Sequence, residues 1–207
     1  MAGEIKINDV SIATESGGTV TLGNATLGST VVLGTNASPI ASNLVLAAGN
    51  GIDFSAASGS AAGSSSAVLN DYEEGTFQPE VYDAASGGNQ LTSNSNYGAY
   101  TKIGNLVTIY FNFSNIVTNG ATAGNTVIFR NLPFTAQSVE NHGTSLGAVV
   151  CDRIINGGFL SAISQANANY ARILKMGNNV GDTYLEVQDI GTSGASDISF
   201  SLTYRVV

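Results

Sequence analysis

Strict alternation between apolar and other residues in two segments constrains the fold of this chain more than any other feature. In the segment 106–113 the odd-numbered residues are aliphatic or aromatic. In the segment 198–206 the even-numbered residues are aliphatic or aromatic. A period of two places successive side chains on opposite faces of a strand, so each segment predicts a strand with one buried face. The residues expected on the buried faces are Val107, Ile109, Phe111, Phe113, Ile198, Phe200, Leu202, Tyr204 and Val206.

Shorter strands and turns rich in Gly and Asn fill the rest of the C-terminal part of the chain. Asn119-Gly120 and Asn156-Gly157-Gly158 are typical turn sequences between strands. Strands spaced by roughly 8–15 residues predict an all-β fold, with an antiparallel β-sandwich of the jelly-roll type over residues 70–207. The one stretch with helical character is 161–176, where two asparagines weaken that alternative. The further strands expected are 126–130, 146–151, 159–163, 170–174 and 183–187.

Residues 1–54 follow a different pattern, in which short apolar pieces are separated by glycine and small polar residues. The triplets 21–23, 26–28 and 32–34 each end in Leu-Gly. Pieces this short cannot bury a core alone, but they can when stacked against copies from neighbouring chains. We therefore expect an extended, Gly-rich β arm that interwinds with partner chains, with a flexible Gly/Ser-rich arm as the alternative. The low-complexity segment 55–69 is expected to be a linker.

The charge balance excludes several classes of protein. Seven basic residues stand against 15 acidic ones, for a net charge of −8 at pH 7, and charged residues make up 11% of the chain against about 25% in an average domain. A protein that reads phosphates needs clustered Lys and Arg, so we expect no nucleic-acid partner. The longest apolar run, 44–48, is too short to span a bilayer, and the N-terminus lacks the pattern of a secretory signal. We therefore expect no membrane partner and synthesis in a cytoplasm.

One segment matches a hydrolase motif without the context that the motif needs. Residues 143–147 (Gly-Thr-Ser-Leu-Gly) fit the G-x-S-x-G elbow, which requires a strand before the serine and a helix after it. Residues 148–151 are β-prone instead, and the only histidine of the chain, His142, lies in the same loop. We therefore expect a glycine-bearing turn here and not a catalytic triad.

Three carboxylates lie close together at Asp71, Glu73 and Glu74. Glycoside hydrolysis needs two carboxylates that face each other across a cleft, whereas neighbours along an extended chain point to opposite sides. We therefore expect a solvated acidic linker or a cation-assisted subunit contact, and in Asp152-Arg153 an ion pair at a strand end. Phosphate-loop, H-E-x-x-H and EF-hand patterns are absent, so we expect no enzyme activity, no catalytic residue, no metal site and no cofactor.

Cys151 is the only cysteine, so no disulfide can form within the chain. It follows the apolar run 146–150, which predicts a small buried hydrophobic residue, with a reactive thiol as the alternative.

Seven of the eight tyrosines are candidates for a binding surface, because flat rings stack on sugars or on neighbouring chains and Asn and Ser side chains add hydrogen bonds. Roughly half of them are expected to lie in the core or between subunits instead. They are Tyr72, Tyr82, Tyr97, Tyr100, Tyr110, Tyr170 and Tyr184.

The segment 69–79 (Leu-Asn-Asp-Tyr-Glu-Glu-Gly-Thr-Phe-Gln-Pro) carries a family resemblance. It resembles a module that recurs at the C-terminal end of fibre-like structural proteins of tailed bacteriophages, in particular those of marine and cyanobacterial hosts. Asp71–Thr76 is its most specific part, and the supporting motifs are 50–55, 97–108, 131–134 and 198–204. The resemblance covers about residues 50–207 and implies a trimeric β-sandwich knob on a virion appendage, without catalytic residues.

Together these observations lead us to expect a non-enzymatic structural protein of a tailed-phage virion, assembled in the host bacterial cytoplasm as a homotrimeric tail fibre. Residues 1–54 would anchor it to other virion proteins of the capsid or tail, and residues 70–207 would present a knob to the host surface. Two alternatives stay open: a capsid decoration or head-fibre protein, and a glycan-binding adhesin module that contacts host surface polysaccharide.

Overall fold

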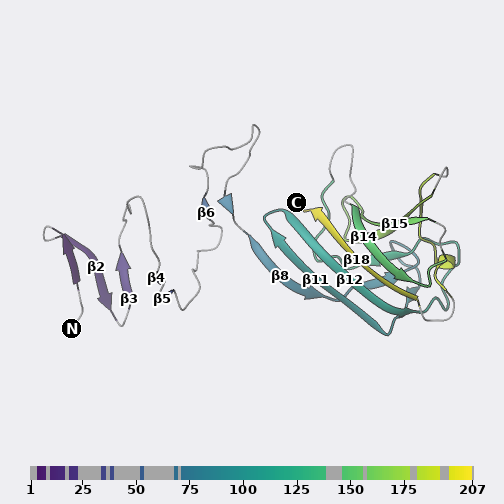
Figure 1. The fold of residues 1–207 in the computed structure, drawn as a ribbon, viewed down its shortest axis with the longest axis horizontal. Coiled ribbons are helices and arrows are strands. Elements are labelled where there is room, and N and C mark those ends of the chain that lie inside the picture. The colour runs from purple at the N-terminus through teal and green to yellow at the C-terminus, as the bar shows by residue number, and fades with distance from the viewer. Residues whose placement is uncertain are drawn as a thin grey trace. The chain divides into compact units, whose positions relative to one another are not determined.

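In a computed structural model the chain is all-β and divides into two compact units, residues 1–46 and 47–207 (Figure 1). The structure describes the backbone of seven short strands between residues 4 and 69, together with residues 71–138, 146–155, 158–177, 181–191 and 196–206. Within these ranges the one helical element is η1, a 3-10 turn at Val187–Asp189. The described residues contain no helix that is long and apolar enough to cross a membrane. The predicted all-β class is confirmed.

The short strands of the N-terminal region pair with their neighbours in sequence. The strands of the first unit are β1 (Glu4–Ile7), β2 (Val10–Ser16), β3 (Thr19–Leu22), β4 (Gly34–Thr35) and β5 (Ser38–Pro39). The first three form an antiparallel sheet and the last two pair with each other. At the start of the second unit β6 (Ile52–Asp53) pairs with β7 (Val68–Leu69). Most of the expected linker 55–69, and the triplet 26–28, lie outside the described residues.

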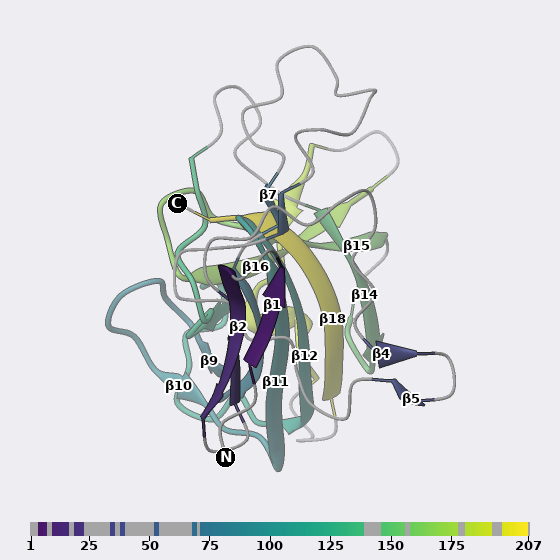
Figure 2. The ribbon, with the colours of Figure 1, turned by 90° about the vertical axis from the view of Figure 1, so that its left-hand side faces the viewer.

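Eleven antiparallel strands of the second unit form one continuous, curled sheet. Their order is β10-β9-β13-β16-β15-β14-β18-β12-β11-β8, and β17 pairs with β16. Figure 2 shows β11, β12, β18 and β14 running side by side, as does Figure 1. The strands are β8 (Tyr72–Phe77), β9 (Glu80–Tyr82), β10 (Gln90–Leu91), β11 (Ser95–Ile103), β12 (Leu106–Ile116), β13 (Ile128–Arg130), β14 (Leu146–Asp152), β15 (Phe159–Ser164), β16 (Tyr170–Met176), β17 (Thr183–Tyr184) and β18 (Ser196–Arg205).

The sheet folds over onto itself at β14. Residues 146–148 of this strand pair with β15, whereas residues 149–152 pair with β18. Gly147 lies at the crossing, where a Cβ atom would be 1.9 Å from the backbone oxygen of Ser201 in β18. Glycine is therefore required for the two strands to approach this closely. The fold produces two facing layers, β8–β11–β12–β18 and β10–β9–β13–β16–β15, which make the sandwich.

The core between the two layers is aromatic. Phe129 of β13 packs against Phe200 of β18 with ring centroids 5.0 Å apart, and against Phe113 of β12 at 5.5 Å. All nine residues expected on the buried faces of the alternating segments are at most 5% exposed. On the opposite face of β12, Leu106 and Tyr110 are 44% and 43% exposed. The alternation therefore correctly predicted both strands and the direction of their side chains.

The segment 161–176 contains no helix, which settles the alternative that its sequence left open. Its residues form the end of β15 and all of β16, which pair antiparallel. Asn167, in the turn between them, has a φ of 56°, a left-handed conformation that asparagine tolerates better than most residues. Four of the predicted strands, 126–130, 146–151, 159–163 and 170–174, occur within two residues of their expected bounds.

The predicted strand 183–187 is too long. β17 ends at Tyr184, and the chain then turns into η1. The carboxylate of Asp189 accepts a hydrogen bond from the backbone N–H of Glu186 at 2.8 Å and forms an ion pair with Lys175 at 2.5 Å. These two contacts hold the turn against the sheet in place of a continued strand.

Candidate functional site

The segment 71–77 forms one edge of the sandwich, and its motif residues pack by pairing glycine with aromatic rings. In the register of β8 and β11, Phe77 lies opposite Gly98, and Gly75 lies opposite Tyr100. A Cβ atom on Gly98 would be 2.5 Å from the Phe77 ring, and one on Gly75 would be 2.9 Å from the Tyr100 ring. Each ring therefore covers the glycine of the neighbouring strand. Phe77 also reaches the core, where its ring and that of Phe111 form a T-shaped pair with centroids 5.1 Å apart.

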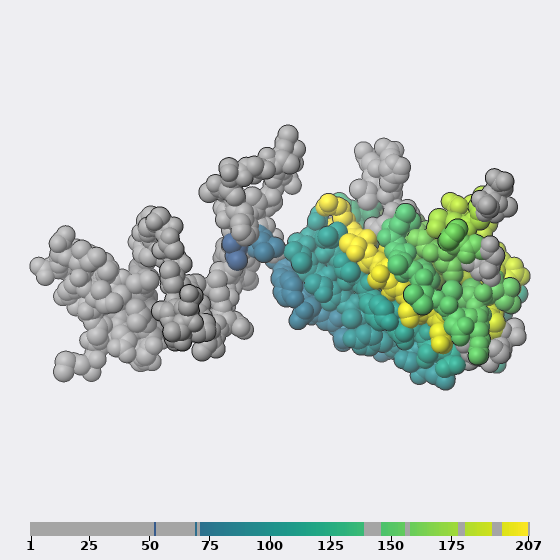
Figure 3. Space-filling view, viewed as in Figure 1, coloured from purple at the N-terminus to yellow at the C-terminus, as the bar shows by residue number. Residues whose placement is uncertain are grey.

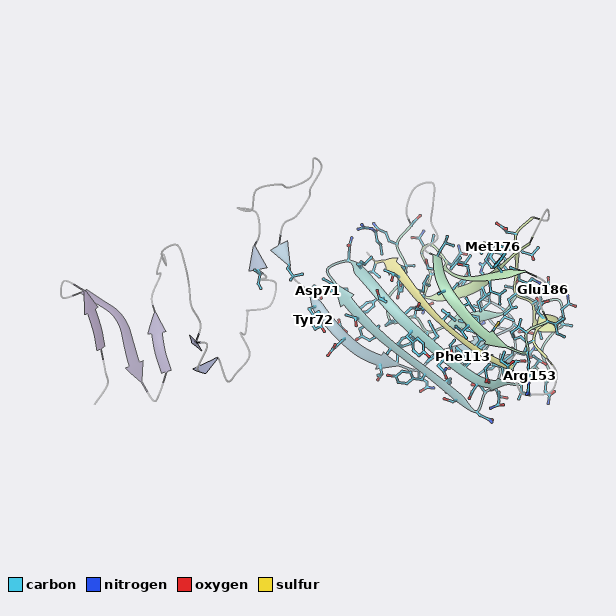
Figure 4. All side chains as sticks on the ribbon, in the orientation of Figure 1. Asp71, Tyr72, Phe113, Arg153, Met176 and Glu186 are labelled. Atoms are coloured by element: carbon cyan, nitrogen blue, oxygen red, sulfur yellow. The ribbon has the colours of Figure 1, made fainter. Side chains whose placement is uncertain are left out.

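The three carboxylates of this segment are held by three different partners. The contacts run from Tyr100 to Glu73, from Tyr72 to Glu74 at 2.8 Å, and from Lys102 to Asp71. The hydrogen bonds to carboxylates are the main cause that raises the pKa of Tyr72 and Tyr100. Figure 4 shows Asp71 and Tyr72 at the start of β8. The carboxylates do not face one another across a cleft, so the geometry lacks the arrangement that glycoside hydrolysis needs.

Asp83 is a buried carboxylate, 2% exposed, that sequence reasoning did not single out. It accepts hydrogen bonds from the backbone N–H and side chain of Asn89 at 2.5 and 3.0 Å, from the backbone N–H of Thr122 at 3.0 Å and from the side chain of Asn125 at 3.4 Å. Burial acts to raise the pKa of Asp83, but these hydrogen bonds outweigh it and lower the pKa from 3.8 to about 2. Because protein donors surround the carboxylate, its role is to hold two loops together.

Asp152 and Arg153 form the predicted ion pair at the end of β14, at 3.7 Å, with side chains 66% and 61% exposed. Cys151, just before them, is exposed, so the prediction of a buried residue is wrong. It lies one residue before the end of β14, where the strand leaves the covered part of the sheet. Partial burial of the sulfur and the charge of Asp152 raise the pKa of the Cys151 thiol, which disfavours a reactive thiolate.

The G-x-S-x-G segment is only partly described. His142 and residues 143–145 lie outside the described residues, and Gly147 lies within β14 and not in a turn. Across the described part of the chain, no group of three or more His, Cys, Asp or Glu side chains is placed to hold a metal ion.

The tyrosines divide into exposed rings and rings that are engaged within the protein. Tyr72, Tyr97 and Tyr110 are 63%, 47% and 43% exposed, and all three point outward from the layer β8–β11–β12–β18. Four of the seven candidate rings are engaged within the protein. The Tyr82 ring lies 3.7 Å from the guanidinium of Arg130. The rings of Tyr170 and Tyr184 lie 5.4 and 4.7 Å from the guanidinium of Arg172, and Tyr100 is described above.

Around the exposed Tyr110 lies a surface that we call the outer hydroxyl face. Its members are Thr101, Thr108, Asn112, Ser199, Ser201 and Thr203, and charged side chains lie only at its margins among the described residues. Thr108 and Thr203 share a hydrogen bond of 2.9 Å, and Asn112 donates one of 2.7 Å to Ser199. A shallow depression of about 210 Å³ on this face is lined by Ala99, Tyr100, Thr101, Thr108, Ile109, Tyr110 and Ser201. Such a surface suits an uncharged ligand with many hydroxyl groups.

Comparison of the sequence with the models of known protein families found no match, and comparison with curated proteins found none either.

Proposed function

We propose that this chain is a non-enzymatic structural protein of a tailed-phage virion, a homotrimeric tail fibre. Residues 1–54 anchor it to other virion proteins, and the sandwich is displayed for contact with the host surface. The observation that carries the proposal is the outer hydroxyl face, a broad, uncharged sheet surface with the exposed ring of Tyr110 in its middle. A face of this kind provides hydrogen bonds and ring stacking for surface contact without catalytic groups.

Two further observations support the proposal. The chain divides into a small N-terminal β unit and a larger sandwich unit, as a protein with an anchor and a displayed head requires. The segment 71–77, which resembles the phage module, closes the edge of the sandwich through its glycine and aromatic residues. The resemblance therefore coincides with residues that the fold needs.

Antibodies raised against the sandwich test the proposal on intact phage particles in the electron microscope. We expect label at the tail, whereas label on the capsid would favour the decoration or head-fibre alternative. Particles that carry no label would refute a virion role. Light scattering tests the trimer separately: a mass three times 21.1 kDa is expected, and a monomer at micromolar concentration would contradict it.

The depression on the outer hydroxyl face favours one second candidate, a glycan-binding adhesin module. On a glycan array, Tyr110→Ala removes a ring that lines the depression, and we expect binding to fall at least tenfold. Tyr184→Ala is the matched control, because that ring stacks on Arg172 in the other layer and should leave binding unchanged. Absence of binding by the unmodified protein at millimolar sugar would rule out this candidate.

A further inference from the structure

The outward row of β14 is aliphatic, which is unusual for a strand with one side on the core. Leu146 and Val150 are 66% and 74% exposed, and Ala148 between them is exposed as well. Val149, which points the other way, packs against the core. The strand therefore presents a row of apolar side chains to the surroundings of the sandwich.

The neighbouring strand β15 extends this row. Ser161 lies opposite Ala148, so Phe159, two residues earlier, is on the same face and diagonal to Ala148. Phe159 is 82% exposed, and Met176 of β16 lies opposite it. We call Leu146, Ala148, Val150 and Phe159 the β14–β15 apolar face. Figure 3 shows the green atoms of β14 and β15 beside the yellow band of β18 on one face of the sandwich.

The β14–β15 apolar face differs from the surface next to it. The outward residues of β18 beside it are Ser199, Ser201 and Thr203, so the aliphatic character stops at β14. No charged residue belongs to the face, although the chain as a whole carries −8. At its end lie Asp152 and Arg153, and Asp197 of β18 lies opposite Asp152, so this rim carries two acidic groups and one basic group. A partner that covers this face must therefore be apolar and must tolerate both signs of charge at the rim.

We propose that neighbouring copies of this chain cover the β14–β15 apolar face, which in the trimer turns toward the three-fold axis, where the faces of the three copies meet. The inference rests on the proposed function, because it assigns the surface through which the copies of that assembly meet. Phe159 protrudes beside the small Ala148, so the ring of one copy can fill the space above Ala148 of the next copy around the axis. Each copy also brings acidic and basic groups to the rim, where Asp152 of one copy can face Arg153 of the next.

The size of the face corresponds to the apolar part of a contact between copies. Side chains of this kind expose on the order of 100 Å² each, so the face and the adjoining Met176 provide roughly 400 Å² of apolar surface. That is about half of the ~800 Å² per partner in a standard stable interface. The serine and threonine side chains of β18 next to it can supply the polar rim that such interfaces have.

Cross-linking of the full chain tests the proposal directly. Val150→Cys in a Cys151→Ser background places a single thiol in the face, and a short bis-maleimide then links copies whose faces meet. The matched control is Leu106→Cys in the same background. Leu106 is also exposed and outward, but it pairs with Arg205, six residues along β18 from the partner of Val150, or about 20 Å away. We expect V150C/C151S to form covalent oligomers at least tenfold faster than L106C/C151S.

A second set of variants measures association itself. Val150→Ser with Phe159→Ser should raise the dissociation constant at least tenfold in light scattering over a dilution series, whereas Leu106→Ser with Tyr110→Ser should not. Equal cross-linking of the two cysteine variants, or a monomeric unmodified chain, would overturn the proposal. A trimer in which V150C/C151S fails to cross-link would refute this face and leave the proposed function standing. If V150C/C151S cross-links efficiently but the antibodies label no phage particle, this face is supported as the contact between copies and the virion role is refuted.

Discussion

Replacing Asp83 by Asn removes the charge that holds two loops together while it keeps the shape of the side chain. Both carboxylate oxygens accept hydrogen bonds, Oδ1 from the backbone of Asn89 and Oδ2 from Thr122 and two asparagine side chains. An amide in this place must point an N–H₂ group at other donors, whichever way it is turned. The ionised form contributes about 2 kcal/mol to stability, because its pKa falls from 3.8 to about 2 on folding and each unit corresponds to ~1.4 kcal/mol.

The sign of the pH dependence follows from the lowered pKa. A carboxyl group whose pKa is lower in the folded state stabilises the fold above the unfolded pKa of 3.8, and this stabilisation is lost as the pH falls toward 2. We expect Asp83→Asn to cost about 2–3 kcal/mol at pH 7 and much less near pH 2. Urea unfolding followed by circular dichroism at fixed protein concentration measures the difference.

Asp182→Asn is the matched control, since Asp182 is exposed. Its free energy of unfolding should stay within about 0.5 kcal/mol of the unmodified protein. If Asp83→Asn were equally neutral at pH 7, or if its cost did not shrink on acidification, the hydrogen bonds to Asp83 would not have the energetic role that their geometry indicates.

Two other substitutions test the packing of the sandwich. Gly98→Ala puts a Cβ atom 2.5 Å from the Phe77 ring, so it should lower the free energy of unfolding by about 1–3 kcal/mol in a thermal or urea melt. Gly124→Ala is the control and should lower it far less, because the added atom meets nothing within 4 Å. Tyr204→Phe removes the hydroxyl that donates to the backbone oxygen of Phe134 at 3.1 Å. The partly buried carbonyl left unpaired should cost about 1 kcal/mol, and a loss below about 0.5 kcal/mol would indicate that water replaces the hydroxyl.

The alternation of apolar residues predicted β12 and β18 well because nearly every inward position of these strands has a large apolar side chain. It did not reveal β8 or β11, because Gly75 of β8 and Gly98 of β11 occupy inward positions. The space above these glycines is filled by rings from the neighbouring strand, Tyr100 and Phe77. A pattern along one strand contains no information about which side chain of another strand covers it.

The candidate surfaces were less predictable than the core. The apolar run 146–151 indicated a buried strand, because continuous apolar runs are typical of strands covered on both faces. β14 changes partners within the run, and this leaves Val150 and Cys151 exposed. The role of Asp83 depends on Thr122 and Asn125, 39 and 42 residues further on, and such loop contacts leave no periodic signal in the sequence.

The edges of the sandwich explain why copies should meet face to face and not by extending the sheet. An unpaired edge strand can add a strand of another copy, and proteins prevent this with short or charged edge strands. β10, at one edge, has two residues, and β8, at the other, follows Asp71 and contains Glu73 and Glu74. Two β8 strands side by side, about 5 Å apart, would bring these carboxylates together at a cost in repulsion. The β14–β15 apolar face has no such charges, so association through it is favoured over addition at an edge.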